Sequence, residues 1–185
     1  MTGLIHTERS MLEALHERYG NSRYIHRGNG PRWVCAEHVR NNAGFEAQRT
    51  ADFMAVDTWL SSGLAVHGHE VKVSRSDWLS ELKAPWKSLP FREIIDYWWI
   101  VAPSTVIVRP EELPPEYGLL VLDKNGFLRA QVTAPRLNDL GAAVKGTWGA
   151  RRTELPPLPR GFVAALLRGV QRCAKDRAVP ITETG

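Results

Sequence analysis

Hydrophobic positions in the first half of the chain follow two periods. Leu12, Leu15 and Tyr19 recur at helical spacing, between Thr7, which can cap a helix, and Gly20, which can end one. Short apolar runs follow, separated by polar breaks that contain glycine or asparagine, a pattern typical of strands. We therefore expect a helix at 7–19 and strands at 33–39, 51–58 and 64–73.

The pattern becomes mixed in the second half. Phe91, Ile94, Ile95 and Trp98 recur on one side of a helix, and the Asn-Gly step at Asn125 is a strong signal for a hairpin turn. Prolines and glycines make 135–160 irregular, and an amphipathic pattern follows it. We expect helices at 76–83, 91–98 and 162–173, strands at 99–102 and 106–108, and a hairpin of strands 118–122 and 127–132.

This order of elements predicts an α/β fold with a central mixed sheet flanked by helices, followed by a C-terminal hairpin and helix. A length of 185 residues is suited to one domain with a substantial core. We therefore expect a single domain over 1–185, with a core at about 7–108 and a C-terminal extension at about 109–185.

Composition narrows the class of protein. A hydrophobic fraction of 43% and a charged fraction of 24% are ordinary for a globular protein, and neither a membrane span nor a secretory signal is evident. The two cysteines, Cys35 and Cys173, are too few for a disulfide framework and indicate thiols in a reducing cytoplasm. A net charge of +4 is consistent with a polyanionic partner.

Two acid–lysine triplets occur in the chain, and their surroundings differ. Glu70 and Lys72 interrupt a β-branched run, so their side chains share one face of a strand. Glu81 and Lys83 lie in a polar helical stretch, where a solvated face is the ordinary interpretation. The first triplet is therefore the better candidate for chemistry, although a structural ion pair between Glu70 and Lys72 fits the spacing equally well.

Asp52, in the preceding strand, supplies a second acid for the same place. Carboxylates are hard ligands that suit Mg²⁺ or Mn²⁺, and the Val71 carbonyl can add a ligand between the two active side chains. Lys72 can orient or deprotonate a water, or offset phosphate charge. The pattern predicts phosphodiester hydrolysis, with Asp52, Glu70 and Lys72 as catalytic residues and Asp52, Glu70 and Val71 as metal ligands.

The histidines of this region allow another interpretation. His67 and His69 share the strand face opposite Glu70, and with His38 they could bind zinc. Neither a cysteine pair nor a His-x-x-x-His helix supports such a site. We interpret them as partly buried or surface histidines.

These residues resemble the PD-(D/E)XK nuclease superfamily and, more narrowly, its MmcB-like DNA-repair branch. The resemblance covers about a third of the chain and rests on Arg49-Thr-Ala-Asp52, Glu70-Val-Lys72-Val-Ser-Arg-Ser-Asp77-Trp78 and Asp96-Tyr-Trp-Trp-Ile-Val-Ala-Pro103. It implies a restriction-endonuclease-like αβββαβ core, in agreement with the order of elements above.

The resemblance also implies roles for single residues. Asp52 and Glu70 look like the metal-binding acids, and Lys72 like the catalytic lysine. Glu37 is similar in place to an acid of that branch, and Glu17 resembles the additional acid that some members use; either could instead be an ordinary surface residue. The region after residue 104 matches nothing in the family.

Five residues near the triplet are our candidates for DNA contact. Ser74 and Arg75 follow the triplet as in the family, and Trp86 stands between Lys83 and Lys87. Aromatic rings stack on unpaired bases, and lysines neutralise phosphates.

The leading hypothesis is a cytoplasmic, Mg²⁺- or Mn²⁺-dependent DNA nuclease of repair, recombination or phage DNA processing. Two alternatives stay open. One is a homodimeric resolvase of Holliday junctions or branched DNA, and the other is a nucleic-acid-binding protein without catalysis. An unrelated basic structural domain is the remaining interpretation.

Overall fold

One six-stranded mixed sheet forms the centre of the protein in the computed structural model, which describes residues 6–20, 31–47, 49–137 and 157–178. The strands run in the order β1 (Trp33–Arg40), β2 (Thr50–Asp57), β3 (Val66–Val71), β4 (Tyr97–Ala102), β5 (Tyr117–Leu122) and β6 (Leu128–Val132). Strands β1, β2 and β3 are antiparallel, β3, β4 and β5 are parallel, and β6 returns antiparallel to β5. The predicted α/β class with a mixed sheet is confirmed.

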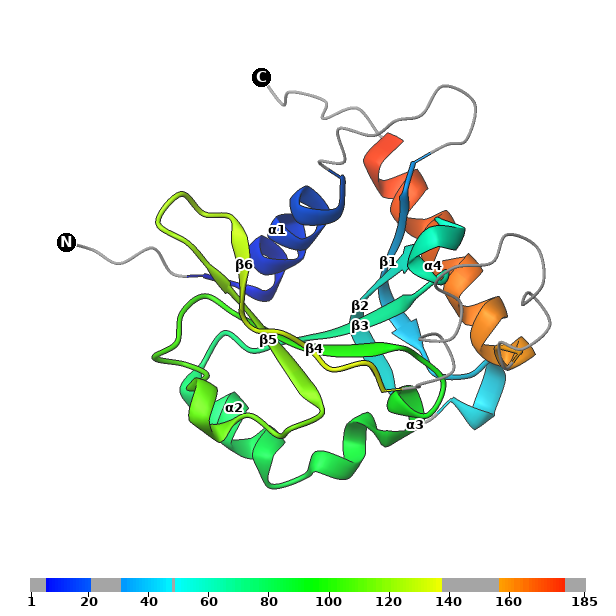
Figure 1. The fold of residues 1–185 in the computed structure, drawn as a ribbon. Coiled ribbons are helices and arrows are strands. Elements are labelled where there is room, and N and C mark those ends of the chain that lie inside the picture. Colours follow the sequence, from blue (N-terminus) through cyan, green and yellow to red (C-terminus); the bar gives the residue numbers. More distant parts are fainter. Residues whose placement is uncertain (1–5, 21–30, 48, 138–156, 179–185) are drawn as a thin grey trace, which may run out of the picture.

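Helices cover both faces of this sheet (Figure 1). Helix α1 (Glu8–Gly20) packs Met11, Leu12 and Leu15 on one face, in a cluster with residues of β2, β4 and β5. The opposite face carries α2 (Arg75–Leu82), α3 (Leu89–Arg92) and α4 (Arg160–Ala178). Short 3₁₀ turns lie at Gly44–Glu46, Leu60–Ser62, Pro85–Ser88 and Pro110–Glu112. None of the described helices is long and apolar enough to cross a membrane.

Gly68 allows the Trp98 side chain to pack closely against β3, two residues before Glu70. It stands opposite Trp98 in the parallel β3–β4 pair, and a Cβ atom at Gly68 would lie 2.6 Å from the Trp98 ring and 2.7 Å from Ile95. Because any larger residue would collide there, a glycine lets the indole pack close to the backbone of β3. Glu70 follows two residues later.

Two of the predicted elements are wrong. The helix expected at 91–98 ends at Arg92 in α3, and Trp98 lies in β4. The cause is tertiary: the Asp96 carboxylate accepts the Val66 N–H at 2.8 Å, and the Asp96 N–H donates to the Val66 carbonyl at 2.9 Å, so the chain joins the sheet there. The strand expected at 106–108 is a turn whose Ile107 N–H donates to the Ser104 carbonyl at 3.1 Å.

The other expected elements are present, with small changes at their ends. The third strand stops at Val71, short of the predicted residue 73, and the hairpin β5–β6 closes through the Asp123 N–H and Phe127 carbonyl at 2.8 Å. Helix α4 packs on β1, where a Cβ at Gly169 would lie 3.0 Å from that of Ala36. The segment expected to be irregular, 135–160, lies mostly outside the described residues.

Candidate active site

Adjacent strands bring Asp52 and Glu70 together. The antiparallel register pairs Phe53 with His69, so the next step along both strands puts Asp52 opposite Glu70. One Asp52 oxygen accepts the backbone N–H of Val71 at 2.7 Å, which fixes the carboxylate across the strand pair. Asp52, Glu70 and Val71, the three residues predicted to hold a metal, therefore lie at the same end of β2 and β3.

Lys72 points into a group of acids. Its side chain is only 6% exposed, and its ammonium nitrogen lies 2.9 Å from a Glu70 oxygen and 3.3 Å from a Glu81 oxygen. Asp77 lies further away, at 3.8 Å. Backbone pairing holds the lysine in place, because its N–H donates to the Val101 carbonyl of β4 at 2.8 Å.

Glu81 is a residue whose role the sequence did not predict. The solvated face expected for the second triplet is wrong for this residue, because its side chain is 11% exposed and contacts Lys72. Lys83, in contrast, is exposed as expected. Helix α2 places Glu81 next to Lys72 at the end of β3. This position depends on how the helix packs, so the spacing of residues in the sequence does not predict it.

Burial and mutual charge control ionisation at this site. Burial raises the pKa of Glu70, and the charge of Asp52 adds to it, so that the pKa reaches about 7 despite the opposing effect of Lys72. Burial also raises the pKa of Asp52, against the Val71 N–H bond. Burial lowers the pKa of Lys72, but Glu70, Glu81 and Asp77 outweigh it and raise the pKa above its ordinary value. Lys72 is therefore a cation at neutral pH.

Two further residues gather around Asp52. An oxygen of Glu8, a ring nitrogen of His38 and an oxygen of Asp52 all lie within 4.8 Å of one another. His38 stands opposite Asp52 in the β1–β2 register and has a positive φ of 49°, uncommon for a non-glycine residue. The pairing of β1 with β2 could have predicted from the sequence that His38 lies near Asp52. Glu8, in the first turn of α1, could not be predicted, because its position depends on how that helix packs on the sheet.

The two additional acids predicted from the resemblance lie elsewhere. Glu17 is exposed and does not belong to the group of Glu8, His38 and Asp52. It follows Glu8 by nine residues, which is about 13 Å along a helix. Glu37 accepts from His16 at 2.7 Å and from Arg9 at 3.2 Å, in a separate group on β1.

The residues after Lys72 build the start of α2. Ser74 is the N-cap of this helix, and its hydroxyl accepts the Asp77 N–H at 3.2 Å. The Arg75 guanidinium forms an ion pair with Glu112 and donates to the Ile107 carbonyl at 3.1 Å. Glu112 also accepts the Trp78 indole N–H. The two predicted DNA contacts Ser74 and Arg75 thus already have structural partners.

The other three DNA-contact candidates follow on the surface. Trp86 is 58% exposed in the 3₁₀ turn Pro85–Ser88, with Lys87 in the same turn and Lys83 at the end of α2. Leu79 and Leu89 are exposed beside them in sequence. A ring accessible to this extent, between two cations, can stack on a base.

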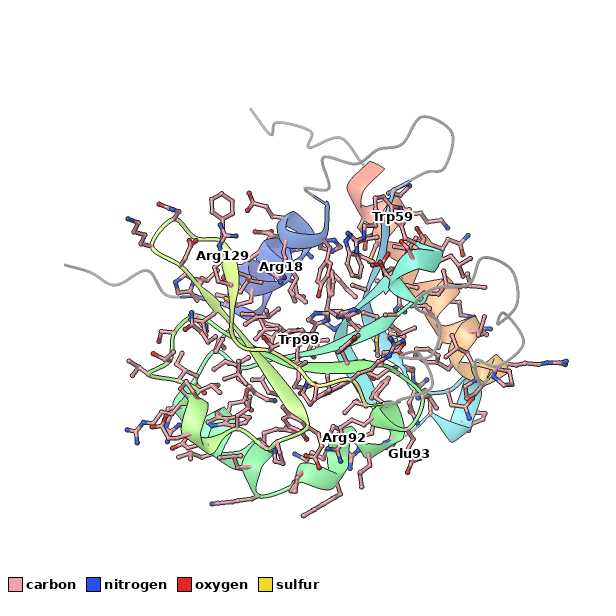
Figure 2. The ribbon with its side chains drawn as sticks, viewed as in Figure 1. Arg18, Trp59, Arg92, Glu93, Trp99 and Arg129 are labelled. Atoms are coloured by element: carbon pink, nitrogen blue, oxygen red, sulfur yellow. The ribbon has the colours of Figure 1, made fainter. Side chains whose placement is uncertain are left out.

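His67 and His69 lie on the α1 side of the sheet, within an aromatic cluster. His69 is fully buried and bonds Tyr19 at 2.7 Å, and His67 accepts the Trp99 indole N–H at 3.1 Å. Figure 2 shows Trp99 near the middle of the molecule. Burial lowers the pKa of both histidines, to about 4 for His67. Neither belongs to a candidate metal-ligand group among the described residues.

The donor set around Asp52 fits a hard divalent cation. Most of the ligands available are carboxylate oxygens, which Mg²⁺ and Mn²⁺ prefer, and His38 adds an imidazole nitrogen. Burial raises the pKa of both Asp52 and Glu70, and the negative charge of Asp52 repels that of Glu70 and raises its pKa further. A cation between them would remove that repulsion.

Comparisons with known proteins give the fold alone. No protein-family model matches the chain, and no curated protein matches it. Among solved structures, the chain is similar to SPO1766, a protein of unknown function from Silicibacter pomeroyi, with a TM-score of 0.55 and 18% identity. The match covers 97% of this chain and 99% of the other, so the arrangement of elements is shared over nearly the whole length.

Proposed function

We propose that the protein is a divalent-metal-dependent DNA nuclease that hydrolyses phosphodiester bonds. The observation that carries this proposal is the convergence of Asp52, Glu70 and Lys72, with Lys72 held 2.9 Å from Glu70 at the end of β3. Asp52, which is partly buried on the neighbouring strand, stands beside the pair, and its charge adds to the effect of burial in raising the pKa of Glu70.

Each residue has a distinct role in this proposal. Asp52 and Glu70 hold Mg²⁺ or Mn²⁺, with the Val71 carbonyl as a further ligand and Glu8 and His38 close to Asp52. The bound ion supplies charge stabilisation at the phosphate and a more acidic water. Lys72 remains protonated, so it orients the attacking water and offsets phosphate charge. Glu70 and Glu81 keep its ammonium group in position.

The surface beside α2 supports DNA as the substrate. Lys83 and Lys87 provide phosphate contacts and the exposed Trp86 a stacking surface. Ser74 and Arg75 are the predicted contacts nearest to the triplet, in the first turn of α2. A cytoplasmic role in DNA repair, recombination or phage DNA processing would suit such an enzyme.

Cleavage assays test the proposal. Purified protein is incubated with single-stranded, duplex, flapped and four-way-junction DNA, with Mg²⁺, Mn²⁺ or chelator. We expect metal-dependent cleavage that Asp52→Asn and Glu70→Gln abolish and that Glu93→Gln leaves unchanged. Glu93 is an exposed carboxylate beyond α3, labelled in Figure 2, and matches the charge change of the other variants. Cleavage that survives both site variants would remove these residues from the mechanism.

The same assays separate the two alternatives. Paired nicks in a four-way junction, together with a dimer in light scattering, would identify a resolvase. DNA binding without cleavage on any substrate would identify a non-catalytic nucleic-acid-binding protein and contradict the proposed nuclease.

A further inference from the structure

A second group of side chains that could bind a metal brings together three elements. It shares no residue with the group of Glu8, His38 and Asp52, called the Asp52 group below. A ring nitrogen of His16 in α1, a carboxylate oxygen of Glu37 in β1 and the sulfur of Cys173 in α4 lie within 4.8 Å of one another. His16 is 8% exposed and Glu37 15%, so these ligand atoms are largely withdrawn from solvent. The proposed nuclease chemistry uses none of the three.

Backbone contacts hold the thiol against β1. The Glu37 N–H donates to the Cys173 sulfur at 3.2 Å. The preceding residue of α4, Arg172, donates to the carbonyls of Glu37 at 3.4 Å and His38 at 3.2 Å. The end of α4 is therefore fixed to the strand that carries Glu37, and hydrogen bonds of this kind orient the ligands of metal sites.

The carboxylate and the imidazole are also oriented. The His16 Nε2 atom lies 2.7 Å from one Glu37 oxygen, and Arg9 donates to the other at 3.2 Å. An ion pair between His16 and Glu37 and the hydrogen bond from the Glu37 N–H to the sulfur account for the contacts without an ion; the gathering of three zinc-type ligand atoms within 4.8 Å is what points to a metal.

We propose that His16, Glu37 and Cys173 form a zinc-binding site that clamps α1 and α4 to β1. Imidazole nitrogen, carboxylate oxygen and thiolate are the three ligand types that zinc takes in proteins, and three protein ligands leave one position for water. The thiolate also selects zinc over Mg²⁺, which prefers oxygen. One thiolate and one carboxylate balance the two charges of the ion.

The geometry needs only local adjustment. Tetrahedral zinc, with bonds of about 2.0 to 2.3 Å, places its ligand atoms about 3 to 4 Å apart. The sulfur, oxygen and nitrogen lie within reach of that arrangement. The 2.7 Å contact between His16 and Glu37 is shorter, so both groups would turn from each other toward the ion. The hydrogen bond from Arg9 to the second Glu37 oxygen would remain.

Cobalt titration of the reduced, metal-free, full-length protein tests this site. A thiolate bound to Co²⁺ gives a charge-transfer band in the near ultraviolet, which oxygen and nitrogen ligands alone do not give. We expect this band to saturate at one equivalent of Co²⁺ and to disappear when one equivalent of Zn²⁺ is added. Because the Asp52 group contains no sulfur, Asp52→Asn should keep the band, and the result is independent of nuclease activity.

Matched variants assign the ligands. Cys173→Ser should abolish the band, whereas Cys35→Ser, which changes the other thiol of the chain, should retain it. Glu37→Gln should keep the band but weaken zinc binding at least tenfold, and Arg9→Ala should weaken it by about 10-fold or more, as loss of a supporting hydrogen bond does. Circular dichroism establishes that each variant is folded. A wild-type protein without the band, or a band that survives in folded Cys173→Ser, would overturn the proposal.

Discussion

Lys72 is a buried cation whose ammonium group contacts two carboxylates and lies near a third. It stays protonated at neutral pH, because these carboxylates raise its pKa by more than burial lowers it. In the proposed nuclease its role would be electrostatic: a protonated Lys72 would offer hydrogen bonds and positive charge to a phosphate or a water and would not accept a proton.

We expect Lys72→Met to reduce the single-turnover rate of DNA cleavage by about 10² to 10³, because one oriented hydrogen-bond donor in a catalytic site contributes about that much. DNA binding should change little, since most binding energy comes from surface phosphate contacts. Lys124→Met, in the exposed β5–β6 turn, removes the same charge and should cleave at the wild-type rate. A cleavage rate for folded Lys72→Met within threefold of wild type would exclude the proposed role.

His67 makes the stability of the fold depend on pH. Its folded-state pKa of about 4 lies below the ordinary value of 6.5, so the unfolded chain binds more protons between these values. Stability is therefore complete above pH 6.5 and falls as the pH drops toward 4, by about 3 kcal/mol for this residue. Buried His69 acts in the same direction.

Urea unfolding of wild type and His67→Gln across this pH range measures the effect. Glutamine can still accept the Trp99 indole N–H but does not titrate, so the variant should lose less stability on acidification. Equal losses in the two proteins would show that His67 does not titrate as described.

Among the elements, the end of β3 owes its position to close packing of β3 against β4. Much of this arrangement could be predicted: strands β1 to β3, helices α1, α2 and α4, and the β5–β6 hairpin all follow from hydrophobic period and turn residues. The start of β4 could not, because Phe91, Ile94, Ile95 and Trp98 follow a helical period that runs on into the strand. Hydrogen bonds between Asp96 and Val66, far apart in sequence, decide between them.

Some residues of the candidate site could likewise be predicted from the sequence, and others could not. Asp52, Glu70 and Lys72 could be predicted, because strand alternation and hairpin pairing are local rules. Glu81 and Glu8 reach the site through the placement of α2 and α1 on opposite faces of the sheet, which is a property of the assembled fold.

Gly68→Ala tests the packing of β3 on β4. The added Cβ would lie 2.6 Å from the Trp98 ring, so the indole or the strand must move, at a cost of about 1 to 3 kcal/mol. Gly20→Ala is the control, because a Cβ there meets nothing within 4 Å. Thermal unfolding should show a lower midpoint for Gly68→Ala alone; equal midpoints would mean that β3 and β4 have room to separate.

At the scale of the whole molecule, the predicted core and C-terminal extension are joined at both edges of the sheet. β5 extends the sheet from β4, and Arg18 of α1 donates to the Leu128 carbonyl of β6 at 2.8 Å. At the other edge α4 packs on β1, where Phe162 is fully buried. Contacts therefore run from the last third of the chain to the first, and residues of both parts contribute to the hydrophobic clusters on both faces of the sheet.

A chain that ends at residue 108 should consequently fail to fold. It would leave β4 as an edge strand and expose Ile100 and Val101, which are fully buried between the helix layers beside β5. We expect this truncation to lack a cooperative thermal transition, while the full chain unfolds in one step with coincident tryptophan fluorescence and circular dichroism. Phe162→Ala in the full chain should keep the single transition but lose about 3 to 5 kcal/mol, because it empties a buried site under α4. A truncated chain with its own cooperative transition would show that residues 1–108 form an independent domain, with β5, β6 and α4 added to it.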